Sequence, residues 1–100
     1  MDEFEDAAVA FVAAVSARLD EYVWNIQSRN DDAAVRAMEV TVALCEQHPA
    51  YAVRPSPRLG SSVQKVISGC LSNAIAKGRG GPKMSDLLVR INEVGRSRVH

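Results

Sequence analysis

The sequence predicts a single all-α domain, a small bundle of four to five short helices. Apolar residues recur at intervals of three and four along most of the chain, and no stretch shows the strict alternation that marks a strand. The chain has 100 residues, of which 47% are hydrophobic and 24% are charged, as is usual for one folded domain. This domain is expected to span residues 1–100.

The first helix is predicted from about Asp2 to Ser28, because apolar residues keep helical spacing from Phe4 to Ile26. Acidic residues at its start oppose the positive end of the helix dipole. Four further apolar residues widen its apolar face: Val9, Val12, Val23 and Trp24. A face this wide predicts either a central position in the fold or contact with a second chain.

A second helix is predicted after Asn30-Asp31-Asp32, whose side-chain oxygens can accept hydrogen bonds from the free amides of a first turn. It should end at His48, because a proline follows and disfavours helical backbone in the residue before it. The next segment, 49–60, contains Pro55-Ser56-Pro57 and is expected to be ordered but extended.

The most regular apolar pattern predicts a third helix that begins at Ser61 or Ser62 and stops at Gly78. Residues 79–82 read Arg-Gly-Gly-Pro and predict a turn. A shorter fourth helix is expected to begin at Ser85 and to fray near Gly95.

The formal net charge is zero, but the charges are divided between the two halves of the chain. Residues 1–50 hold ten acidic and three basic side chains, whereas residues 51–100 hold nine basic and two acidic ones. The zero sum argues against the strong positive field of a nucleic-acid binder. The two halves can attract each other within the fold or face different partners.

The chain is expected to be cytoplasmic. Its longest apolar run, nine residues from Ala7 to Val15, is about half of the ~20 residues that a membrane-spanning helix needs. The acidic N-terminus does not resemble a secretory signal, which begins with basic residues. Cys45 and Cys70 should remain thiols in a reducing compartment.

No catalytic residues, metal site or cofactor are predicted. A zinc site built from Cys45, His48, Cys70 and His100 would need its ligands in two closely spaced pairs, but the last two are thirty residues apart. The paired carboxylates at the start of the second helix are interpreted as helix caps.

Residues 77–83, Lys-Gly-Arg-Gly-Gly-Pro-Lys, are the sharpest basic feature. Glycine amides surrounded by cations can hold an anion, although the residue order is not that of a P-loop and a solvated turn also explains the segment. A helix-turn-helix interpretation has less support, because the fourth helix offers only Arg90 and Asn92 for reading bases.

The acidic half indicates a different function, since carboxylates on a rigid helical surface can occupy a partner's Lys/Arg groove in place of phosphates. In size, helicity and the acidic segment Asn30-Asp31-Asp32 with its flanking helices, the chain resembles the small helical anti-CRISPR proteins of phages and mobile elements. The resemblance implies a non-enzymatic inhibitor or regulator that binds a nucleic-acid-handling protein complex and blocks it. The candidate partner-binding residues are Asp20, Glu21, Tyr22, Trp24, Arg29, Asn30, Asp31 and Asp32.

Two alternatives remain open. The first is a small nucleic-acid-binding regulator, assembled as a homodimer through the apolar faces of the first helices. Its candidate anion-binding residues are Arg54, Arg58, Lys77, Arg79 and Lys83. The second is a structural or assembly subunit.

Overall fold

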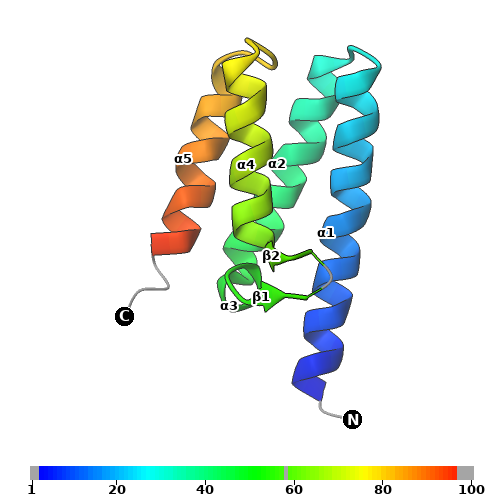
Figure 1. Cartoon of the computed structure of the whole chain (residues 1–100), viewed down its shortest axis with the longest axis vertical. Coiled ribbons are helices and arrows are strands. Elements are labelled where there is room, and N and C mark those ends of the chain that lie inside the picture. The colour runs from blue at the N-terminus through cyan, green and yellow to red at the C-terminus, as the bar shows by residue number, and fades with distance from the viewer. Residues whose placement is uncertain (1–2, 58, 97–100) are drawn as a thin grey trace.

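The computed structural model describes residues 3–57 and 59–96, with side chains from Asp6 onward. It confirms the predicted all-α class, with five helices and one short strand pair in the described ranges (Figure 1). The elements in order are α1 (Glu3–Gln27), α2 (Asp31–Gln47), α3 (Pro49–Ala52), β1 (Pro55–Ser56), β2 (Ser61–Ser62), α4 (Val63–Ala76) and α5 (Pro82–Arg96).

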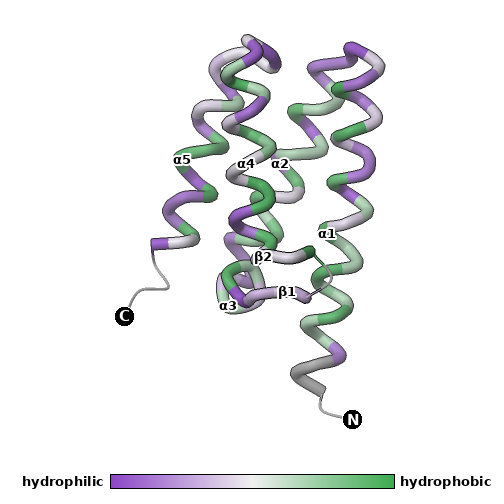
Figure 2. Tube along the Cα trace, in the orientation of Figure 1, coloured by the Kyte–Doolittle hydropathy of each residue, from purple (hydrophilic) through white to green (hydrophobic). Residues whose placement is uncertain are grey.

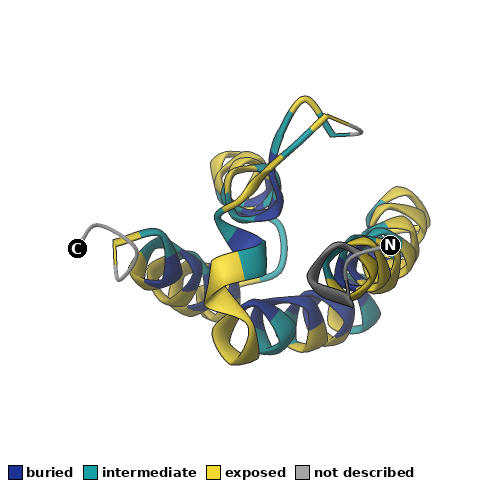
Figure 3. Ribbon diagram, turned by 90° about the horizontal axis from the view of Figure 1, so that it is seen from below, coloured by how far each residue is buried: buried dark blue, intermediate teal, exposed yellow. Residues whose placement is uncertain are grey.

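The four long helices form two antiparallel hairpins, α1 with α2 and α4 with α5, and α2 joins them by packing against α5 (Figure 1). The main neighbour of α1 is α2, so α1 lies at one edge of the domain with much of its outer side exposed (Figure 3). The prediction that α1 lies centrally in the fold is therefore wrong. Contact of this face with a second chain stays a prediction.

The hydrophobic core lies where the inner faces of α2, α4 and α5 meet, and α1 adds Phe11, Val15 and Tyr22. Its largest fully buried aliphatic side chains include Met38, Ile67, Leu71, Met84 and Ile91. The hydrophilic residues gather instead at the end of the molecule that holds the α1–α2 turn and the α4–α5 loop (Figure 2). This division leaves that end free for polar contacts.

The segment between α2 and α4 differs from the extended connection that was expected. Pro49 ends α2 but also begins the single turn of α3, because its fixed φ and missing N–H suit a first helical position. Pro55 and Ser56 then pair antiparallel with Ser62 and Ser61, and these two-residue strands close the connection into a hairpin.

The fourth predicted helix, α5, begins at Pro82, three residues before the expected start at Ser85, because proline also fits its first position. It continues through Gly95 to Arg96. Two predicted caps are confirmed: Asn30 Oδ1 accepts a hydrogen bond from the Ala33 amide at 3.3 Å. Ser62 Oγ does the same for the Lys65 amide at 3.2 Å.

Helices α1 and α4 end in the same backbone arrangement. In α1 the Asn30 amide donates to the Asn25 carbonyl at 2.8 Å, and in α4 the Arg79 amide donates to the Ala74 carbonyl at 2.8 Å. This is the Schellman motif, which needs a left-handed residue just after the helix. Gly78 fills that position in α4 with φ of 69°, whereas Arg29 fills it in α1 with φ of 61°. Arg29 is thus a bulky residue in a conformation that favours glycine.

Candidate functional site

An ion pair joins the two interhelical turns at the hydrophilic end. Arg79 from the α4–α5 loop contacts both carboxylate oxygens of Asp31 through Nε at 3.1 Å, and its Nη2 lies 2.5 Å from Oδ1. The same Nη2 donates to the Ile26 carbonyl at the end of α1, at 2.9 Å. Arg79 therefore holds the last turn of α1 and the first residue of α2 together.

The loop amides take part in the same contact. The Gly80 amide donates to Asp31 Oδ2 at 3.2 Å, so the glycine-rich loop and its arginine together bind one carboxylate. The hydrogen bonds from Arg79 are the main cause that holds the pKa of Asp31 below its usual range. The loop was predicted to hold an anion or to be a solvated turn, and in the structure its anion is a carboxylate of this chain.

A second ion pair also links the acidic and basic halves. Arg90 on α5 donates from Nε to Glu46 on α2 at 3.0 Å, and its Nη2 lies 2.5 Å from the other carboxylate oxygen. Asn92, the other candidate base reader, accepts a hydrogen bond from Ser68 Oγ at 3.1 Å. Both candidate base readers thus make contacts between helices of this chain, which argues against the helix-turn-helix interpretation.

The candidate partner-binding residues divide into exposed and structural ones. Tyr22 is only 5% exposed and packs in the core, so it is not a surface anchor, and burial raises the pKa of its hydroxyl. Asn30 serves as the cap of α2, and Asp31 is held by the basic loop. The remaining members are exposed: Asp20, Glu21, Trp24, Arg29 and Asp32.

The outer side of α1 combines apolar and acidic side chains. Among the described residues, five large apolar side chains are exposed, and three of them, Val9, Val23 and Trp24, lie on α1. Trp24 is 70% exposed. Asp20 and Glu21 precede it by four and three residues, which places all three on one side of the helix. Glu21 also pairs with Arg18 one turn earlier, at 2.7 Å.

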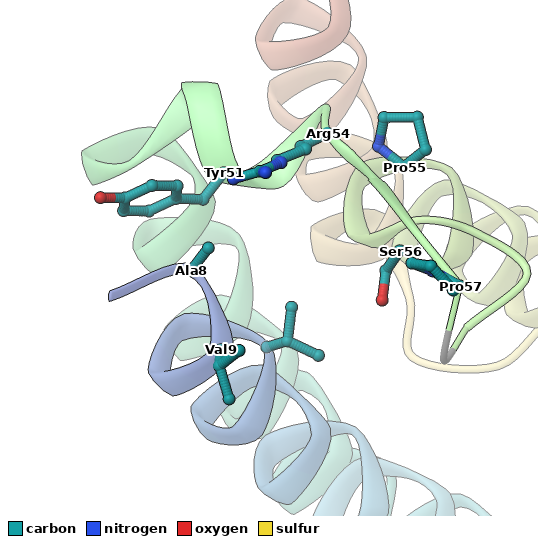
Figure 4. Close-up of a pocket in the computed structure, with 8 residues that line it drawn as sticks. Ala8, Val9, Tyr51, Arg54, Pro55, Ser56 and Pro57 are labelled. Carbon is teal, nitrogen blue, oxygen red and sulfur yellow. The ribbon is translucent and has the colours of Figure 1, made fainter. Parts of the chain in front are cut away.

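A groove of about 410 Å³ lies between the first turns of α1 and the β hairpin. In Figure 4, Ala8 and Val9 stand on one side, Ser56 and Pro57 stand on the other, and α3 closes one end. The lining also includes Val12, Tyr51, Arg54 and Pro55. Nothing in the sequence signals this groove, because its two sides lie more than forty positions apart along the chain.

A second cavity, of about 460 Å³, lies at the opposite end beside the Asp31–Arg79 pair. It is lined by Ile26, Gln27, Arg29, Asp31, Lys77 and Arg79. Arg29 was expected to contact a protein partner, but here it lies with two of the candidate anion-binding residues.

The five candidate anion-binding residues do not form one surface. Lys77 and Arg79 line the second cavity, whereas Arg54 lines the groove at the other end of the molecule. Lys83 is exposed in the first turn of α5, outside both linings. Arg58 lies outside the described residues. A single nucleic-acid surface built from all five is therefore not what the fold provides.

The groups considered for catalysis or metal binding are dispersed. Within residues 3–57 and 59–96, no three His, Cys, Asp or Glu side chains gather as a metal site would require. Burial raises the pKa of the Cys45 thiol to about 12 and also raises that of Cys70, so neither thiol is activated. His48 packs with Phe11 and Tyr51 at ring distances of 5.9–6.0 Å. His100 lies outside the described residues.

No described helix has the combination of length and apolarity that crossing a bilayer requires. Comparison of the chain with protein-family models, with curated proteins and with solved structures finds no match. The described residues offer two candidate surfaces, the exposed acidic and apolar side of α1 and the basic cavity at the end of the same helix.

Proposed function

We propose that this protein is a non-enzymatic inhibitor or regulator that binds a basic surface of a protein partner through the outer side of α1. One observation carries the proposal: α1 is an edge helix that holds Trp24, 70% exposed, on the same side as Asp20 and Glu21. Tryptophan is enriched among residues that dominate binding energy at protein interfaces. Acidic neighbours would select a partner surface rich in lysine or arginine.

Charge argues for a different protein as the partner rather than a second copy. Helix α1 carries five acidic residues and one basic residue. Two copies paired through this helix would bring like charges together, which costs binding energy in either orientation. A basic partner would instead gain from the same charges.

A partner that handles nucleic acid fits this chemistry. Its basic surface would normally contact phosphates, and carboxylates on α1 would compete for the same groups. In this proposal the competing acids are Asp20 and Glu21 on α1 and the exposed Asp32 in the first turn of α2. Glu21 takes part although it pairs with Arg18, because both side chains of that pair are nearly half exposed. Asp31 is not among them, because Arg79 and the Gly80 amide hold its carboxylate.

The test begins by capturing the partner from the native cell, identifying and purifying it, and measuring its affinity by calorimetry. Trp24→Ala should weaken binding about tenfold or more, as expected for a hot spot. The matched control, Val89→Ala, removes another exposed apolar side chain, 61% exposed on α5, and should leave the affinity unchanged.

Charge is tested with a second matched pair. Asp20→Lys should weaken binding and reduce its dependence on salt, whereas Asp86→Lys, the same change at an exposed position of α5, should not. The protein should also displace nucleic acid from the partner. Unchanged affinity for both Trp24→Ala and Asp20→Lys would refute the proposed surface, and simultaneous binding of nucleic acid would refute the inhibitory action.

A further inference from the structure

We infer that the second cavity, between the α1–α2 turn and the α4–α5 loop, is a binding site for a phosphate group. The inference does not depend on the proposed function. Three of the six residues that line the cavity are cations, namely Arg29, Lys77 and Arg79, and the only acid among them is Asp31. The cavity volume, about 460 Å³, is ample for a phosphate group and part of the molecule that carries it.

Two of the cations are available to a ligand. Among the described residues, Arg29 and Lys77 have no hydrogen-bonded or ion-paired acidic partner, and both are exposed. They come from different turns, since Arg29 follows α1 and Lys77 follows α4. The fold thus brings together two positive charges that lie 48 positions apart in the sequence.

Arg79 adds directed hydrogen-bond donors. Its Nε and Nη2 are used by Asp31 and by the Ile26 carbonyl. A guanidinium carries five N–H donors, and the two on Nη1 have no acceptor among the described residues. A phosphate can therefore bind beside Asp31, accepting from Nη1, without displacing the carboxylate.

The balance of charge favours an anion. Asp31 neutralises Arg79, which leaves the charges of Arg29 and Lys77 uncompensated within the lining. Carbonyl groups at the ends of α1 and α4, and the exposed carboxylate of Asp32, oppose this charge. We therefore expect phosphate binding in the millimolar range for the bare ion and stronger binding for pyrophosphate, which carries more charge.

The backbone of Arg29 is a second observation that agrees with a ligand role. Its φ of 61° is left-handed, and the equivalent position at the end of α4 is the glycine Gly78. A residue with a Cβ is less favourable than glycine in this left-handed conformation, and such strain concentrates at binding sites. Arg29 is one of the residues that line the cavity, and a glycine at this position would carry no positive charge.

The test titrates the protein with pyrophosphate and follows backbone amides by NMR and heat by calorimetry. Arg29→Gly relieves the backbone strain and should fold normally, and Lys77→Gln changes an exposed side chain. Each should weaken pyrophosphate binding about tenfold, the typical effect of losing one charge-assisted hydrogen bond. Lys83→Gln removes the same charge from an exposed position near the loop but outside the cavity lining, and should have little effect.

A short single-stranded oligonucleotide is titrated in parallel. Tighter binding of the oligonucleotide that also depends on Arg29 and Lys77 would identify a polynucleotide backbone as the source of the phosphate, and tighter binding of pyrophosphate would identify a small molecule. Absence of saturable binding for both probes, or an equal loss with Lys83→Gln, would overturn the inference. Because Trp24→Ala leaves the cavity lining unchanged, it should retain pyrophosphate binding even if it abolishes partner binding.

Discussion

Gly80 should be the least replaceable glycine of the α4–α5 loop. It has φ of +81°, and a Cβ built on it would lie 2.4 Å from Met84 Cγ and 2.6 Å from Met84 Cε. Met84 is fully buried against the core, so its side chain cannot move away without disturbing other core residues. Gly81, the next residue, has φ of +68° but has no atom within 4 Å of the same added carbon.

The two glycines separate backbone strain from steric overlap. Alanine at either position adopts a left-handed conformation, which lowers the free energy of unfolding by about 1–2 kcal/mol. Alanine at Gly80 also forces an extra carbon into packed space, and such overpacking costs about 1–3 kcal/mol. Gly80→Ala should therefore lower the free energy of unfolding by about 2–5 kcal/mol, against about 1–2 kcal/mol for Gly81→Ala.

Urea unfolding followed by circular dichroism at the helical band is the suitable assay. The fluorescence of Trp24 is a poor probe, because its side chain is already 70% exposed in the folded state. In a domain of this size, 1 kcal/mol corresponds to about 4–8 °C in the melting temperature, so the two variants should be well resolved by heating too.

The physical cause can be tested with a double mutant. Met84→Ala alone should lower the free energy of unfolding. Adding Gly80→Ala to that variant should lower it further only by about the cost of the left-handed backbone, because the Met84 atoms that would overlap the new Cβ are gone. Equal destabilisation by Gly80→Ala and Gly81→Ala, or a fully additive double mutant, would refute the overlap with Met84.

Three further predictions concern stability and reactivity. The pKa values of Asp31 and Glu46 are lowered by hydrogen bonds from their arginine partners. The stability that these pairs provide is thus present above the unfolded pKa of about 4 and is lost as pH falls through the folded pKa. The urea concentration at the midpoint of unfolding should therefore decrease when the pH is lowered below about 4, and it should decrease less steeply for Asp31→Asn than for the wild type. Ser62→Ala removes the cap of α4 and should cost about 1 kcal/mol in a denaturant titration, and no change would contradict the capping role. Cys45, with a pKa of about 12, should react with a thiol reagent only when the chain unfolds, so labelling at the rate of a free thiol in native buffer would contradict its burial.

Local chemistry explains which parts of the fold could be predicted from the sequence. The caps at Asn30 and Ser62 and the stop at Gly78 depend on neighbouring backbone groups, and all three are confirmed. Pro49 was predicted only to end a helix, and Pro82 was predicted to lie in a turn. Each of them also begins a helix, because the fixed φ and missing N–H of proline suit the first helical position. The two-residue strands are too short to show any periodicity.

The candidate site was harder to predict because it depends on the packing of α1. Tyr22 belongs to the regular apolar stripe of the first helix and Trp24 widens it, and both were candidate partner-binding residues, yet Tyr22 is 5% and Trp24 70% exposed. Only the placement of α1 against a single main neighbour decides which of them is covered. The left-handed backbone of Arg29 was equally hidden, since a Schellman end is recognised in sequence by glycine, which is absent here.

Some charges of the acidic and basic halves form ion pairs within the fold, and others have no ion-pair partner among the described residues. The ion pairs Asp31–Arg79 and Glu46–Arg90 join the acidic and basic halves, because they connect α2 with the α4–α5 loop and with α5. The formal charge of zero therefore includes opposite charges that are paired within the fold, and it does not give the local charge of any part of the surface. Among the charges without an ion-pair partner in the described residues, Asp20 lies beside Trp24 on α1. Arg29 and Lys77 lie at the cavity where the same helix ends. A partner that α1 recruits through its acids would approach next to the proposed phosphate site. Asp20→Lys changes only the acidic side of α1 and Lys77→Gln changes only the cavity, so the two variants distinguish the two surfaces.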